Sequence, residues 1–188
     1  GAAFLDSRRA GWTGLNSFML THLWWHLALF RLGQGRGDEA LAIYDDHAWA
    51  VAKDYSQDQI GAVSLLARLE LAGVEVGDRW DELGGWLAAR AEDTLQPFLT
   101  LQYLYGLARA GRPEADRLLA AIRRAAANAP DHIREAWRDI ALPAAEGLTA
   151  HARGDFETAV KRLGQALPRL IEVGGSHAQR DLFEQIYL

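Results

Sequence analysis

The chain has 188 residues, 49% of them hydrophobic, and 25 acidic against 20 basic residues give it a formal net charge of −5. This length and composition can fill one core, and no basic stripe of the kind that neutralises nucleic-acid phosphates is present. Cysteine is absent, which excludes disulfides and thiolate metal sites and makes the cytoplasm the default expectation.

Helical periodicity dominates the chain, since apolar residues recur at spacings of three and four, as in Leu65, Leu66 and Leu69, rather than alternating. Second helices begin at turn residues Asp38, Asp78, Pro113 and Asp155, which lie 40, 35 and 42 residues apart. The pattern predicts an all-α fold in a single domain over 1–188. It is an α-α superhelix of about four antiparallel helical hairpins near 14–53, 58–92, 95–128 and 132–172, with a C-terminal capping helix at 176–188.

Within these hairpins the helices are expected at 14–33 with 38–53, 58–73 with 78–92, 95–110 with 113–128, and 132–153 with 155–172. Pro143 and Pro168 fall inside helical patterns, and each removes an amide hydrogen bond, so breaks or kinks are expected there. Ser176 and Gln179 have the spacing of a capping box and predict a new helix start.

The most apolar stretch, 15–32, is too polar for a bilayer span of about 20 apolar residues. Its interruptions are Asn16, Ser17, Thr21, His22, His26 and Arg31. The chain start also lacks the ordered basic, apolar and small-residue regions of a signal peptide. We therefore expect neither membrane nor nucleic-acid partners.

Partial tetratricopeptide patterning marks the first and last hairpins: Trp24, Ala28, Gly35, Ala40 and Tyr44, and then Gly147, Gly154, Phe156, Ala159, Leu163 and Ala166. Small residues at Ala28, Ala40, Gly147 and Ala159 should let paired helices approach closely. Tryptophans, including Trp24, Trp25, Trp80 and Trp86, are expected to pack between hairpins rather than to form a stacking platform.

Three segments carry a more specific resemblance: 22–29 with 39–45, 64–69 with 73–80, and 174–183. Their residues and their order resemble the C-terminal portion of the tetratricopeptide repeat protein 38 family and its bacterial relatives. The resemblance implies a helical-repeat protein without an established activity, cut from a longer chain. It adds Asp58 as a candidate ligand-binding residue, although this chain has Gly61 where relatives tend to have a second acidic residue.

His22, Trp25, His26 and Leu29 lie at i, i+3, i+4 and i+7 and so share one stripe of a helix. Leu20, Leu23, Leu27 and Phe30 make the other sides apolar, which predicts burial nearly all round. The stripe has two main interpretations: histidines that hydrogen-bond a neighbouring helix and fix packing, or a small-ligand pocket. A third interpretation is a metal ion bound at the His-x-x-x-His spacing. The sequence indicates no further metal ligand beside the two histidines, so we expect no metal and no cofactor.

His177, Arg180, Asp181 and Glu184 form a second stripe, after Gly174-Gly175. Arg180 could grip an anion in bidentate fashion, with backbone amides at the helix start facing it. Alternatively, Arg180 ties helix ends together through Asp181, Glu184 or an exposed carbonyl. The pocket hypothesis requires His177 and Arg180 to point toward the His22 stripe.

Catalysis has no positive motif, because no Gly-rich phosphate loop, nucleophile elbow or recognisable acid pair is present. The leading prediction is a noncatalytic protein-interaction or scaffold module that binds a protein or peptide, or the missing N-terminal part of a longer chain. The alternative is a small-molecule binding or enzyme domain that uses His22, His26, His177 and Arg180. If a capping part is missing, self-association is expected at the Gly11 to Leu15 end.

Overall fold

The computed structural model describes residues 1–188, and all of its regular structure is helical. The predicted all-α fold of consecutive helix pairs is therefore confirmed. The chain divides into two compact units, Gly1–Arg79 and Trp80–Leu188, and each is described by itself. The sequence predicted one domain, and the boundary between the units falls inside the predicted hairpin of 58–92.

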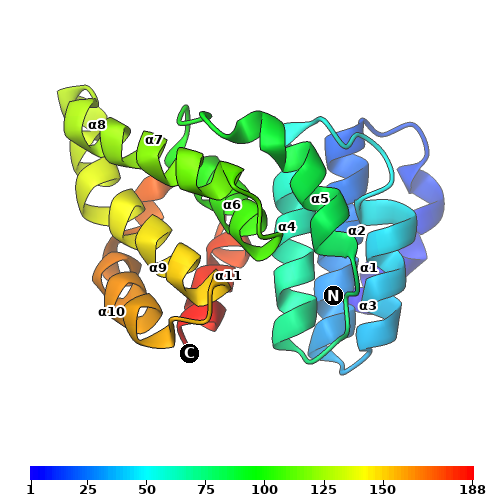
Figure 1. The fold of residues 1–188 in the computed structure, drawn as a ribbon. Coiled ribbons are helices and arrows are strands. Elements are labelled where there is room, and N and C mark those ends of the chain that lie inside the picture. The colour runs from blue at the N-terminus through cyan, green and yellow to red at the C-terminus, as the bar shows by residue number, and fades with distance from the viewer. The chain divides into compact units, whose positions relative to one another are not determined.

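In the first unit, α1 (Ala2–Arg8) and a 3₁₀ turn (Arg9–Trp12) precede α2 (Ser17–Gly33), which the Asn16 side chain caps by accepting a hydrogen bond from the Met19 amide. The next elements are α3 (Gly37–Ile43), a π-helical turn (Tyr44–Ala48) and α4 (Ser56–Leu71). Figure 1 shows α2, α3 and α4 side by side, and α1 also contacts α2. Sequence reasoning missed α1.

The second unit continues with α5 (Arg79–Leu87), whose first residue ends the first unit, and a 3₁₀ turn (Ala88–Arg90). Its two long pairs are α6 (Pro97–Arg109) with α7 (Glu114–Asn128), and α9 (Leu142–Ala152) with α10 (Phe156–Ala166), as Figure 1 shows. Between the pairs lie α8 (Asp131–Glu135) and a π-helical segment (Ala136–Ala141). A 3₁₀ segment (Leu167–Val173) and α11 (His177–Tyr187) end the chain, and α11 starts with the predicted capping box.

One turn geometry ends the first helix of each pair. Gly35, Gly73, Gly111 and Gly154 all have positive φ. The amide after each glycine donates to the carbonyl five residues earlier, at 2.9 to 3.0 Å, as Arg36 does to Arg31 and Arg112 does to Leu107. This is the Schellman motif, and its recurrence explains the periodic helix ends. The second helix of the 58–92 hairpin was predicted to begin at Asp78, and α5 begins one residue later, at Arg79.

Close approach within a pair depends on small residues, as predicted. A Cβ atom added at Gly147 of α9 would lie 2.7 Å from Leu163 Cγ and 2.9 Å from the Leu163 amide nitrogen of α10. Ala28 and Ala40, at matching positions in the first pair, are both fully buried. The backbones of α9 and α10 are therefore in close contact at Gly147.

The helical structure continues through both internal prolines, but the type of helix changes near each of them. A π-helical segment ends two residues before Pro143, and α10 gives way to a 3₁₀ segment one residue before Pro168. Since a proline ring crowds the carbonyl four residues back, a change of helical pitch relieves that contact. None of the helices has both the length and the apolar composition needed to cross a membrane.

Two burial predictions were wrong. Trp86 was expected to pack, but its side chain is 44% exposed, because α5 buries the opposite face through Trp80, Leu83 and Leu87. The α2 helix was expected to be buried nearly all round, but Phe30 is 41% exposed. The helices that contact α2 cover one side of it and leave a stripe open.

Candidate functional site

The two histidines of α2 turn toward each other. Their Nε2 atoms lie 3.1 Å apart, and their rings meet edge to face at 84°. Neither ring makes another hydrogen bond within the protein, so they do not serve a neighbouring helix as the packing interpretation required. Burial lowers the pKa of both histidines, and the charge of His26 lowers that of His22 further, so both are neutral at pH 7.

Aromatic side chains form one wall of this histidine pair. The Trp25 ring stacks on His22 at 5.5 Å between centroids and 11° between planes, and Phe18 lies on His22 at 5.2 Å. Trp25 is buried, and its indole Nε1 has no hydrogen-bond partner. A buried donor without a partner costs about 1–3 kcal/mol.

From α4, the Arg68 guanidinium reaches over the Trp25 ring at 5.7 Å. Its Nη1 also donates to the Ser64 hydroxyl and to the Ser64 carbonyl, which orients the head group along α4. Sequence reasoning missed Arg68. The available signal was a cation in the run Leu65-Leu66-Ala67-Arg68-Leu69, where a charged side chain must be buried or must reach out of an apolar helix.

The carboxyl group of Asp58, near the start of α4, is only 2% exposed. Its Oδ1 lies 2.9 Å from the Thr21 hydroxyl of α2, and its Oδ2 has no partner. Burial is the main effect and raises the pKa of Asp58, against the lowering effects of Thr21 and the Ala52 amide. Asp58 therefore joins α2 to α4 through Thr21, rather than facing solvent.

If Asp58 is ionised, its carboxylate competes with two backbone carbonyls for the single proton of the Thr21 hydroxyl. This hydroxyl lies 2.9 Å from the Ser17 carbonyl, 3.2 Å from the Phe18 carbonyl and 2.9 Å from Asp58 Oδ1, and it has one proton. The Thr21 hydroxyl therefore shares its single proton among three acceptors, of which Asp58 Oδ1 is the one on α4.

The second predicted stripe lies on α11, in the other unit. Arg180 Nη1 donates to the carbonyls of Gly174 and Gly175, which is the helix-end role considered as the alternative to anion binding. Asp181 accepts a hydrogen bond from Gln185, and His177 is exposed. The first-turn amides are partly satisfied by the capping box, since Gln179 N donates to the Ser176 hydroxyl. A site that joins His177 and Arg180 to His22 stays a prediction.

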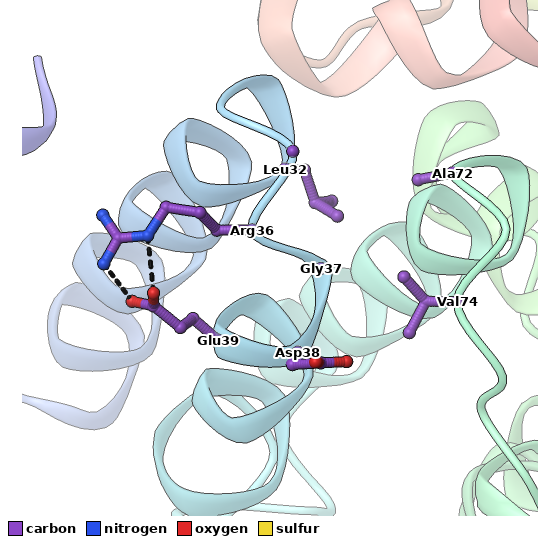
Figure 2. Close-up of a pocket in the computed structure, with 8 residues that line it drawn as sticks. Leu32, Arg36, Gly37, Asp38, Glu39, Ala72 and Val74 are labelled. Atoms are coloured by element: carbon purple, nitrogen blue, oxygen red, sulfur yellow. Dashed lines mark hydrogen bonds and ion pairs between the residues drawn. The ribbon is translucent and has the colours of Figure 1, made fainter.

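Two shallow depressions lie elsewhere. One, of about 450 Å³, is lined by Leu32, Gly35, Arg36, Gly37, Asp38, Glu39, Ala72 and Val74. Figure 2 shows Arg36 and Glu39 turned to each other on one side of it, joined by bonds of 2.5 and 2.6 Å. The other, of about 350 Å³, has Arg124 paired with Glu92 at 2.7 Å on its rim. Their arginines already have carboxylate partners, so the histidine cluster of α2 offers more to a ligand.

The fold and the cluster together define an all-α helical-repeat protein with a histidine and aromatic site on its first long helix. No group of three or more His, Asp or Glu side chains is arranged to hold a metal ion. No family model matches the chain, and no solved structure matches it.

Proposed function

We propose that this chain is a noncatalytic tetratricopeptide-like module that binds an amphipathic helix of a protein partner along the open stripe of α2. The single observation that carries the proposal is this stripe: Met19 and Phe30 are 40% and 41% exposed, and Leu23 and His26 lie between them, half-buried. These residues recur at i, i+4, i+7 and i+11, so they share one face.

The length and surroundings of the stripe favour a helix as its occupant. Met19 and Phe30 are eleven residues apart, or roughly 16 Å, which matches three turns of a partner helix. In α4, by contrast, every residue from Asp58 to Leu69 is buried except Gly61. Repeat proteins bury each helix pair against its neighbours, so the exposed apolar face of an outer helix is the surface on which another helix packs.

Membership in the tetratricopeptide repeat protein 38 family is part of the proposal, supported by the residues that resemble it, and the resemblance implies a helical-repeat protein without an established activity. The absence of cysteine supports a cytoplasmic setting. The partner helix is supplied by another protein. A segment of a longer version of this chain, or a second copy, is an alternative result of the test.

The test begins with a photo-crosslinking amino acid at Met19, with the exposed Phe156 of α10 as the matched control position. In the native host, the Met19 position should crosslink to a defined amphipathic segment and the Phe156 position should not. A synthetic peptide of that segment should bind the purified chain one to one and gain helicity. Phe30→Asp should weaken this binding at least about tenfold while leaving circular dichroism unchanged.

Three results would contradict the proposal. Crosslinks at both positions to the same proteins would show nonspecific contact. Crosslinks only to a second copy would assign the face to self-association, as the sequence predicted for the Gly11 to Leu15 end. A peptide that binds Phe30→Asp as tightly as the unmodified chain would place the interface elsewhere.

A second candidate function is small-molecule binding at the histidine cluster, favoured by the buried Trp25, whose ring stacks on His22 and whose Nε1 has no hydrogen-bond partner. In this interpretation His22 and His26, both neutral, hydrogen-bond a ligand or act as acid and base. His26→Ala should then abolish binding of a metabolite found by screening, with the melting temperature changed by no more than a few degrees. A large loss of stability without any ligand would favour packing instead.

A further inference from the structure

We propose that His22 and His26 form a two-histidine chelate for a divalent transition-metal ion of the kind that imidazole prefers: Cu²⁺, Ni²⁺ or Zn²⁺. The proposal goes beyond the helix-binding function and does not depend on it. It revises the expectation of no metal, which depended on the missing third ligand.

The distance between the two Nε2 atoms suits chelation of one metal ion. Imidazole nitrogens bind zinc at about 2.0–2.1 Å, so two of them lie about 2.9 Å apart at a right angle and about 3.3 Å apart at a tetrahedral angle. The observed separation between His22 Nε2 and His26 Nε2 is 3.1 Å, between these values. Both side chains come from one helical turn, so the pair is positioned without any help from loop folding.

Within the protein, the two Nε2 atoms have no hydrogen-bond partner other than each other. If the rings hydrogen-bond to each other, one Nε2 carries a proton and the other accepts it. A metal ion would use a lone pair on both. Since neither ring bonds to another helix, replacing the proton with a metal breaks no other contact in the fold.

The histidine pair is open to solvent on one side and leaves coordination positions of a bound metal ion unfilled by the protein. Both histidines are half-buried, so solvent reaches them, and Trp25 and Phe18 shield one side. No third His, Asp or Glu is grouped with them. The remaining positions are therefore taken by water or an exogenous ligand, as in metal sites that keep an open position.

The test uses the untagged 188-residue chain and the metals alone. Calorimetric titration at pH 7.5 should show one Cu²⁺, Ni²⁺ or Zn²⁺ bound per chain. His22→Gln and His26→Gln should each weaken binding by about tenfold or more, because a single imidazole cannot chelate. His132→Gln, at an exposed histidine on α8, is the matched control and should bind as the unmodified chain does.

A second measurement keeps the proposal falsifiable if a histidine variant fails to fold. Electron paramagnetic resonance of Cu²⁺ on the unmodified chain should show coupling to two equatorial imidazole nitrogens. Coupling to one nitrogen or none would overturn the chelate. So would the absence of binding by any of the three metals, or equal affinity in folded His22→Gln and His26→Gln variants.

Discussion

The close approach of α9 and α10 makes Gly147→Ala a sharp test of the repeat packing. The new Cβ would lie 2.7 Å from Leu163 Cγ, 2.9 Å from Leu163 N and 3.2 Å from the Ala159 carbonyl oxygen. Two of these atoms belong to the backbone of α10, so no change of side-chain rotamer can relieve the steric contact with them. The two helices must therefore move apart. Overpacking of this kind costs about 1–3 kcal/mol.

Helix propensity has the opposite effect on stability, because it favours alanine over glycine. A control variant must therefore show this effect alone. Alanine in place of glycine inside a helix stabilises it by about 0.5–1 kcal/mol. Gly85, in α5 of the same unit, is exposed and has nothing within 4 Å of an added Cβ, so Gly85→Ala should show that gain alone. The two variants should therefore differ by about 2 kcal/mol, with Gly147→Ala the less stable.

Thermal unfolding followed by circular dichroism measures the difference. For a chain of this size, about 2 kcal/mol corresponds to roughly 4–8 °C in melting temperature. Gly85→Ala should melt slightly above the unmodified chain and Gly147→Ala clearly below it. If Gly147→Ala were stabilised as much as Gly85→Ala, α9 and α10 would not be in backbone contact at this point and the packing argument would be refuted.

Three further predictions concern stability. Because burial raises the pKa of Asp58 above its usual 3.8, the folded chain holds that proton more tightly than the unfolded chain, and stability falls as the pH rises above 3.8. Asp58→Asn should therefore gain stability relative to the unmodified chain between pH 4 and pH 7 in urea titrations, while the exposed Asp81→Asn control should not; equal pH dependence in both would exclude a buried acid. Thr21→Val removes the donor and acceptor facing Asp58 and should cost about 1–3 kcal/mol at pH 7, measured in the same way; no loss would mean that the Thr21 contact is unimportant. Trp137→Ala should cost about 3–5 kcal/mol because Trp137 is fully buried, whereas Trp86→Ala should cost less than about 1 kcal/mol; similar losses would contradict their assigned burial.

Much of the fold was predictable because its signals are local. The capping box of Ser176 and Gln179 involves residues of one helical turn, and the prolines at 143 and 168 act on the carbonyl four residues back. Glycines in turns of positive φ end the first helices for the same short-range reason. The helix α1 was missed because its seven residues have no cap or periodic pattern long enough to read.

The candidate site was predictable only in part. The spacing of His22 and His26 places them on one face of a helix, but it does not say that their Nε2 atoms turn toward each other rather than toward a neighbouring helix. Trp86 and Trp137 look alike in the sequence, and only the packing of the helices around them decides that one is exposed and the other buried.

The sequence alone determined the helix starts and ends that carry a cap, a glycine turn or a proline, because these signals act over a few residues. The tertiary structure alone decided which residues of different helices meet: Arg68 over Trp25, and Asp58 against Thr21, thirty-seven positions away. Such contacts depend on how whole helices pack, and the free energy that selects them is spread over many buried side chains rather than carried by any local pattern.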